Sequence, residues 1–422
     1  MFFLNKYFGG KTIGKQKLYL IAITIIWTIF CKGFSFSYWN NNLNYIEFIF
    51  VLFVLFYTFA TWGKASQKHF KSIVILFSIL PFFSAINSYI YFEQSPFESI
   101  RAIFKVTFIP LTYFVLHKLK LQEATILKSF FLTTLFILIL QVVQQFTYPT
   151  FYFGGYTEAQ IELLNLDSKS VEMRNGLYRF RIEGLLSPLF LFIFWIWVTK
   201  KYETTILIFA GLMLLSVYLT LTRQVILSAI ITILLSFLLH KRLKNTSKFN
   251  IIILLLVVVC ILAIYFDDLF GSFVETSQSD MSENYIRILA AQYYWNDYIK
   301  SPLVMLFGYG APGQTGLFHN YVEKLNDYRF FVADIGFLGY AWRFGAIYVI
   351  VCVYAFFMIF FKYKKSCPLY IRLYVCYAMI MSPMIFPFFG AVNMLYISFL
   401  FYICDLHINN SPLALYSTRI DS

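Results

Sequence analysis

Twelve apolar runs along the chain are long enough, or nearly so, to cross a membrane as helices. A membrane-crossing helix needs about 20 predominantly apolar residues. The runs are 18–31, 44–62, 72–92, 100–116, 127–146, 184–199, 204–221, 224–240, 249–266, 335–361, 370–389 and 391–404. They predict an all-α, polytopic membrane protein with about twelve transmembrane helices.

The composition supports this class and excludes several others. Only 13% of the residues are charged and 60% are hydrophobic, whereas a water-soluble domain needs roughly 25% charged residues. A soluble globular enzyme, a disordered protein and a coiled coil are therefore excluded. Most of the six cysteines lie inside apolar runs, which argues against a disulfide framework or a zinc site. We expect no metal.

Two apolar segments differ in length from a single membrane span: one is shorter and one is longer. The run 18–31 is short enough to be a signal peptide, but Cys31-Lys32-Gly33-Phe34 after it is a poor cleavage site, so we interpret the run as a span. Residues 204–240 have only one charge, Arg223. As one helix this stretch would reach about 55 Å, so it must fold back, and we expect a tight hairpin at Arg223.

The basic residues predict the topology. With a cytoplasmic N-terminus the inside segments are 1–17, 63–71, 117–128, 200–203, 241–248, 362–372 and the tail from 405. They hold 21 of the 34 Lys and Arg residues. Because cytoplasmic loops carry an excess of these residues, we expect both termini in the cytoplasm. Topology thus explains the net charge of +13 without nucleic acid as a partner.

Two of the outside connections are long, 147–183 and 267–334, and together they carry 14 of the 21 acidic residues. Loops of this length are usually functional or disordered. Their aromatic and amphipathic content favours order, for example as short helices on the outer membrane face. The predicted organisation is 1–146 (helices one to five), 147–183 (first long loop), 184–266 (helices six to nine), 267–334 (large loop between spans nine and ten) and 335–422 (helices ten to twelve and tail).

Polar residues within the spans gather near the predicted outer boundary. They are Glu47, Asn87, Arg101, Lys105, Gln141, Gln144, Gln145, Arg223 and Arg343. Snorkelling of side chains near helix ends is one explanation. The one-sidedness of the set favours a polar cavity that opens to the outside. A transporter would need polarity across both halves, and prolines within the spans leave that alternative open.

Arginines on the predicted outer side contradict the positive-inside bias and suggest a function. Arg179 and Arg181 precede Glu183 at the start of span six, Arg223 lies at the hairpin, and Arg287 lies in the large loop. A guanidinium is permanently charged and its planar fork suits phosphate oxygens. A pyrophosphate at the membrane surface is therefore a natural ligand. The alternatives are ion pairs with nearby glutamates, snorkelling, or contacts with lipid phosphate.

The large loop adds a histidine and a glycine-rich run. His319 is the only histidine on the predicted outside, and a neutral imidazole can take a proton from an attacking hydroxyl. A polar surface histidine is the alternative. The run Gly308-Tyr309-Gly310-Ala311-Pro312-Gly313 permits a tight turn that could present backbone amides. It has no preceding strand, which argues against a dinucleotide site.

The order of these motifs resembles the O-antigen polymerase and O-antigen ligase superfamily. The motifs are Thr222-Arg223, Arg287, Gly308-Tyr309-Gly310, His319-Asn320-Tyr321 and the Gly336-x-x-Gly339 entry to a helix. The resemblance covers roughly residues 175–360. The chain departs from the family at Thr222, where Ser is frequent, and in the segment between His319 and Gly336, which is rich in charge and aromatics. The second departure is compatible with a different acceptor.

The resemblance implies a GT-C-like membrane glycosyltransferase whose donor is an undecaprenyl-pyrophosphate-linked glycan, with no metal or other cofactor. By motif position, Arg223 and Arg287 would hold the pyrophosphate and His319 would act on the acceptor hydroxyl. Arg181 is a third candidate cation. Direct attack would invert the anomeric carbon. Candidates for supporting roles are Arg179, Glu183, Asn320, Tyr321 and Arg343.

Three functions follow as hypotheses. The first is a polymerase in the bacterial inner membrane that joins lipid-linked repeat units at the periplasmic face. The second is a ligase that transfers the glycan to lipid A-core. The third, from another class, is a flippase or other transporter of lipid-linked oligosaccharides. The expected partners are the undecaprenyl-pyrophosphate-linked glycan, membrane lipids, a chain-length regulator and a flippase, with no nucleic acid.

Overall fold

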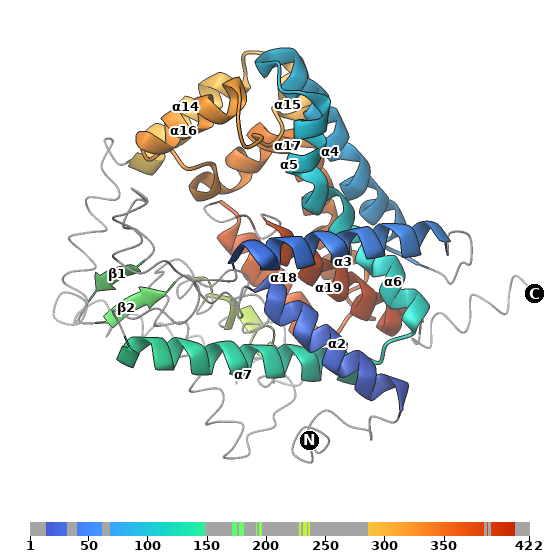
Figure 1. Cartoon of the computed structure of the whole chain (residues 1–422). Coiled ribbons are helices and arrows are strands. Elements are labelled where there is room, and N and C mark those ends of the chain that lie inside the picture. The colour runs from blue at the N-terminus through green and yellow to red at the C-terminus, as the bar shows by residue number, and fades with distance from the viewer. Residues whose placement is uncertain are drawn as a thin grey trace, which may run out of the picture.

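The computed structural model describes part of the chain, and those residues are mainly helical (Figure 1). The described residues are 14–31, 40–60, 68–147, 171–174, 177–180, 191, 194–195, 228, 231–233, 235–236, 286–383, 386 and 390–409. Helix is what a span requires, because a bilayer offers no partners to exposed backbone polar groups.

The N-terminal part contains helices at the first five predicted spans. They are α2 (Lys15–Phe30), α3 (Asn40–Ala60), α4 (Lys71–Phe92), α5 (Pro96–Phe108), η1 (Ile109–Leu111), α6 (Thr112–Leu119) and α7 (Glu123–Thr147). The start of α5 follows from local sequence, since Ser95 caps Glu98 N–H and Pro96 occupies the first turn. Pro110 converts the middle of the fourth span into the 3₁₀ turn η1, because proline lacks the amide that an α-helix needs there.

The C-terminal part contains helices at the last three predicted spans. They are η2 (Val332–Ile335), α17 (Gly336–Phe357), the π-helical turn η3 (Met358–Lys362), α18 (Leu369–Met381) and α19 (Ala391–Asn409). Helix α18 is shorter than the predicted 370–389. It ends at Met381, two residues before Pro383, because proline has no N–H to continue the helical hydrogen bonds.

Five helical segments are long and apolar enough to cross a membrane among the described residues. They are Lys71–Phe92, Pro96–Leu119, Glu123–Thr147, Val332–Lys362 and Ala391–Asn409. Two shorter apolar helices, Tyr45–Ala60 and Leu369–Met381, accompany them. These helices are consistent with a polytopic membrane protein. The predicted spans 184–199, 204–221, 224–240 and 249–266 lie wholly or mostly outside the described residues, so the total of twelve stays a prediction.

One strand pair departs from the all-α prediction. In the first long loop, β1 (Val171–Arg174) pairs antiparallel with β2 (Leu177–Phe180). The two residues between them in the sequence are Asn175 and Gly176, the dipeptide that two-residue hairpin loops favour. This local turn chemistry explains strands where short helices were an expectation.

Aromatic packing joins helices that are distant in sequence. Trp27 of α2 is fully buried and its ring centroid lies 4.9 Å from that of Phe130 in α7. The same ring lies 5.7 Å from Tyr396 and 5.8 Å from Phe399, both in α19. Helix α19 is buried on nearly all sides, which fits a sequence that is apolar all round.

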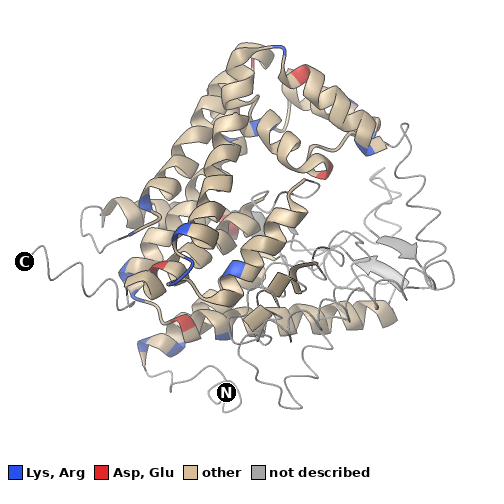
Figure 2. Ribbon diagram, turned by 180° about the vertical axis from the view of Figure 1, so that it is seen from behind, with Lys and Arg blue, Asp and Glu red and all other residues tan. Residues whose placement is uncertain are grey.

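For α4, α5, α6 and α19, segments predicted for opposite sides of the membrane lie at opposite ends of the helices. The turn between α4 and α5 lies at the top of Figure 1 with the large loop, whereas α6 and α19 end in the lower half. Figure 2 shows most of the described Lys and Arg residues in that lower half. This separation is what the charge pattern predicts. Which end faces which compartment stays a prediction.

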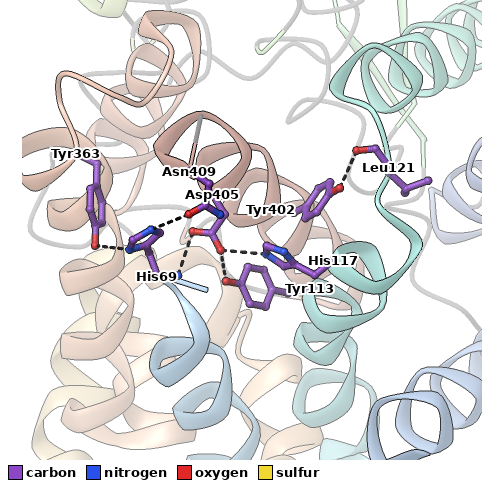
Figure 3. Close-up of polar contacts among 8 residues, drawn as sticks. All are labelled: His69, Tyr113, His117, Leu121, Tyr363, Tyr402, Asp405 and Asn409. Atoms are coloured by element: carbon purple, nitrogen blue, oxygen red, sulfur yellow. Dashed lines mark hydrogen bonds and ion pairs between the residues drawn. The ribbon is translucent and has the colours of Figure 1, made fainter. Parts of the chain in front are cut away.

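A buried carboxylate ties the lower ends of four segments together (Figure 3). Asp405 of α19 is fully buried. Its Oδ2 accepts a hydrogen bond from Tyr113 and lies 3.0 Å from His117 Nε2. Its Oδ1 accepts from the backbone N–H of His69 at 3.2 Å. The His69 ring in turn lies within 3.4 Å of Tyr363 Oη. Asp405 therefore joins α6, α19 and the turn before α4, and His69 extends the network to the turn after η3.

We expect Asp405→Ala to destabilise the protein by about 3–5 kcal/mol, the usual cost of removing one partner of a buried charged cluster. The change leaves the donors on Tyr113, His117 and His69 without this acceptor. Thermal unfolding of the detergent-solubilised protein measures the effect. Asn409→Ala is the matched control, because it removes a peripheral contact to the His69 ring (3.2 Å) and leaves Asp405 in place. Equal unfolding midpoints for both variants would contradict this role of Asp405.

Candidate functional site

The described part of the large loop folds into three short helices, α14 (Ile286–Tyr298), α15 (Pro302–Phe307) and α16 (Leu317–Asp327). This confirms the expectation of ordered short helices for these residues. Helix α16 buries Phe318, Val322 and Leu325, whose spacing places them on one face of a helix. The loop therefore has a core of its own.

That core is an aromatic cluster built on Trp342 of α17. The Trp342 ring is fully buried. Its centroid lies 5.0 Å from Tyr294 of α14, 5.2 Å from Tyr309 and 6.0 Å from Phe318 of α16. Phe92, at the end of α4, stacks on Phe318 at 4.2 Å. Such pairs add roughly 0.5–1.5 kcal/mol each beyond burial, so the cluster fixes α14 and α16 on α17.

Asp297 is the polar centre of this cluster. It lies on α14 and is only 8% exposed. Its Oδ2 accepts hydrogen bonds from the Trp342 indole at 2.9 Å and from the Tyr321 hydroxyl at 3.3 Å. Lys300 Nζ lies 3.0 Å from Oδ1. Asp297 thus links the three helices that carry Arg287 (α14), His319 (α16) and Arg343 (α17).

Asp297 did not emerge from the sequence as a site residue. The sequence feature that could have indicated it is an acidic residue within the aromatic run Tyr293-Tyr294-Trp295-Asn296-Asp297-Tyr298. An acid surrounded by aromatic side chains on an amphipathic helix must find hydrogen-bond donors if its side of the helix is buried. Only the tertiary structure shows that Asp297 is on the buried side.

The phenols around Asp297 are held in the neutral form. Burial raises the pKa of Tyr321 well above its ordinary value, and the hydrogen bond with Tyr293 and the charge of Asp297 add to this. Burial, followed by the charge of Asp297, raises the pKa of Tyr309 in the same direction. These hydroxyls therefore act as neutral hydrogen-bonding groups over the whole physiological pH range.

The glycine-rich run serves packing, and the prediction that it presents amides to a ligand is wrong for four of its N–H groups. Those of Gly308, Tyr309 and Gly310 donate to the carbonyls of Val304, Trp342 and Arg343 at 2.7–2.8 Å. That of Gly313 donates to Gln94 Oε1 at 2.7 Å. A Cβ at Gly308 (φ +72°) would overlap the backbone of Arg343, so this close approach requires glycine.

Polar residues of α4 anchor the same run. Asn87 Nδ2 donates to the Gly308 carbonyl at 2.8 Å, and Ser88 Oγ donates to the Tyr309 carbonyl at 2.6 Å. Elsewhere in the predicted polar set, buried Glu47 pairs with Lys105. These polar groups form hydrogen bonds or ion pairs with other parts of the chain. Their presence within the spans therefore does not require that each of them lines a cavity.

Arg287 is held loosely. Its Nε lies 3.9 Å from Asp334 Oδ2, and the two side chains are 36% and 43% exposed. An exposed pair at this distance contributes roughly 0–1 kcal/mol, so a diphosphate can replace Asp334 at little cost. On the helix, Arg287 lies on the same side as buried Ala290 and Tyr294. That position fits a site better than a lipid anchor.

His319 lies in the first turn of α16 and is half-buried. Within the described part of the chain it makes no hydrogen bond or ion pair. Of its neighbours, Asn320 is exposed, and the Tyr321 hydroxyl lies 2.9 Å from that of Tyr293. Arg343 is half-buried on α17, within electrostatic range of Tyr294. The structure thus places Arg287, Arg343 and the 319–321 motif on three helices around one core.

The other predicted residues cannot be placed in this site. Arg181, Glu183 and Arg223 lie outside the described residues. Arg179 belongs to β2, where the strand register sets it opposite Glu172 of β1.

Comparison with known families gives a match to part of the chain. Residues 208–353 match the family model described as O-antigen ligase. The matched segment includes Arg223, Arg287, Arg343 and the motif 319–321, and it excludes Arg179, Arg181 and Glu183. No curated protein shows a significant match to the chain. The match confirms the predicted resemblance over this segment.

Proposed function

We propose that this chain belongs to the O-antigen polymerase and ligase superfamily and is an inverting membrane glycosyltransferase. It joins undecaprenyl-pyrophosphate-linked repeat units into O-antigen or a related surface polysaccharide at the periplasmic face. The observation that carries the proposal is that Arg287, His319 and Arg343 belong to three helices that pack on the Trp342 cluster, inside the matched segment. Apolar helices beside the site suit a lipid-linked substrate.

In this mechanism Arg287 stabilises the leaving group. When the anomeric C–O bond breaks, the lipid diphosphate takes the electron pair and its negative charge increases. A fixed cation at such a position lowers the barrier by roughly 3–4 kcal/mol. The weak contact with Asp334 leaves the guanidinium fork free to bind two diphosphate oxygens. Arg223 and Arg181 would supply further positive charge.

His319 is the proposed base. A ring nitrogen takes the proton of the acceptor hydroxyl as the oxygen attacks the anomeric carbon from the side opposite the diphosphate. The attack forms one C–O bond, breaks another and inverts the carbon. The nearby carboxylates suit this task less. Asp297 already accepts bonds from Trp342 and Tyr321, and Asp334 faces Arg287.

The test is a transfer assay with purified protein in detergent. The substrate is a lipid-pyrophosphate-linked repeat unit, without metal or nucleotide, and the products are separated on a gel. A ladder of longer lipid-linked glycans would establish the polymerase. Transfer only after addition of lipid A-core would show a ligase instead. No transfer in either reaction, with folded protein and the correct sugar unit, would reject the glycosyltransferase proposal in favour of transport.

We expect His319→Ala to lower the transfer rate by about 10²–10⁴-fold, the usual contribution of a positioned general base. The fold should survive, because His319 makes no hydrogen bond within the described residues. Glu323→Gln, an exposed change one turn further along α16, is the control and should retain activity. Unchanged turnover in a well-folded His319→Ala variant would exclude His319 as the base.

A further inference from the structure

The turn after α16 contains a residue in an unfavourable conformation. Arg329 has φ +62°, at the position after a helix where glycine is usual. Its N–H donates to Asn326 O at 2.8 Å, and that of Phe330 donates to Leu325 O at 2.9 Å. These two bonds form a Schellman motif. Arginine is more strained than glycine in this conformation. Its presence here suggests that the Arg329 side chain has a function.

This turn completes a continuous aromatic surface, which we call the aromatic face. It consists of Tyr293 of α14, Tyr321 of α16, and Tyr328 and Phe330 of the turn. The hydroxyls of Tyr293 and Tyr321 lie 2.9 Å apart. The Phe330 ring centroid lies 5.7 Å from Tyr293 and 6.3 Å from Tyr328. Tyr293 is 37% exposed and Tyr328 is 59% exposed, so the face is accessible.

Buried groups hold the aromatic face rigid from below. The Tyr321 hydroxyl donates to Asp297 Oδ2 at 3.3 Å. The Tyr294 hydroxyl donates to the Phe330 carbonyl at 2.8 Å. A surface whose rings are fixed before binding loses little conformational freedom when a ligand arrives. This organisation distinguishes the face from aromatic residues exposed singly.

The aromatic face is bordered mainly by polar and charged side chains. The exposed residues of α16 are polar except for Leu317 at its start, namely Asn320, Glu323, Lys324 and Asp327. The other flank of α14 carries exposed Ile288 and Trp295, and exposed Ile299 follows directly after the helix. Their spacing forms one apolar stripe. That stripe suits the lipid interface, where Trp is enriched. The aromatic face, with its charged surroundings, suits a hydrated ligand.

We propose that the aromatic face is a glycan-binding subsite that stacks against pyranose rings of the growing chain. This inference rests on the proposed function and deepens it. A pyranose presents an apolar C–H face and a rim of hydroxyls. A tyrosine presents an apolar ring and a hydroxyl, and Arg329 adds a donor fork at the edge. The ligand class is therefore a hydroxylated sugar chain.

The subsite binds sugars remote from the reacting bond. His319 and Tyr328 are nine residues apart along α16, which corresponds to roughly 14 Å at the helical rise. Sugars at the Tyr328 end of the aromatic face are therefore remote from the acceptor hydroxyl, whereas Tyr321 at its other end is two residues from His319. Loss of the face should weaken binding of long glycans and leave the chemical step unchanged.

The experiment compares Tyr293→Ala and Tyr328→Ala with the native protein, using acceptors of one and of several repeat units. We expect the KM for the long acceptor to rise about tenfold, as for loss of one aromatic contact, while kcat and the KM for the short acceptor stay unchanged. The matched control is Trp295→Ala, another exposed aromatic residue of α14 but on the apolar stripe. Its KM should equal the native value.

Two further measurements distinguish loss of the glycan subsite from general destabilisation of the protein and from failure of the proposed transferase activity. Arg329→Gly removes the left-handed arginine, so it should raise the thermal unfolding midpoint while raising the long-acceptor KM, a combination that damage cannot produce. Calorimetry with the repeat-unit oligosaccharide, released from its lipid by mild acid, tests binding without transfer. Binding that is lost in the tyrosine variants supports the subsite even if transfer fails. Native KM and native binding in both tyrosine variants would overturn it.

Discussion

Arg287→Ala should lower glycan transfer by about 10²–10³-fold, the effect of removing one fixed donor that stabilises developing charge. The folded state should persist, because the only ion pair described for Arg287 is the exposed 3.9 Å contact with Asp334. The measurement is the initial rate of ladder formation with saturating lipid-linked donor. Circular dichroism in the same detergent verifies that the helices are retained.

Two companion variants identify which property of Arg287 matters. Arg287→Lys keeps the charge but loses the planar fork, and we expect its rate to lie between those of the native protein and the alanine variant. Lys324→Ala removes an exposed cation of α16 and should leave the rate unchanged. If Arg287→Ala keeps full activity, or if Lys324→Ala loses as much, Arg287 does not bind the diphosphate.

Gly345→Ala should destabilise the protein by about 3 kcal/mol or more, because it combines backbone strain with overpacking. Gly345 interrupts α17 with φ +85° and ψ 164°, a conformation essentially restricted to glycine. An added Cβ would overlap the Leu306 carbonyl oxygen of α15. Since α15 leads into the glycine-rich run, the substitution should displace the loop and abolish transfer as well.

Gly390→Ala is the control for the Gly345 experiment. Gly390 has φ +86°, almost the same as Gly345, but an added Cβ would meet no atom within 4 Å. Because both variants place alanine at a positive φ, the difference between the two unfolding midpoints mainly measures the contact with α15. Similar midpoints for both variants would show that α15 does not pack on α17 as described.

The linear sequence was sufficient where a local property decides the structure. Eight of the predicted spans coincide with helices because the length of an apolar run and the position of prolines are local signals. Arg287 and His319 were found because their charge or chemistry is unusual for the outer side, which needs no knowledge of contacts. The strand pair of β1 and β2 shows the limit, because the aromatic and amphipathic content of the long loops favoured short helices.

The tertiary structure decided what the polar and glycine residues do. Asn87 binds the Gly308 carbonyl across 221 positions of sequence, and no local pattern encodes that pairing. Gly308 and Gly310 allow the loop to approach α17 and α4, a purpose that their sequence spacing does not distinguish from ligand binding. Asp297 became the centre of the site only because the buried side of α14 faces Trp342. Apolar run lengths are set by the membrane, whereas hydrogen-bond partners are set by which helices meet.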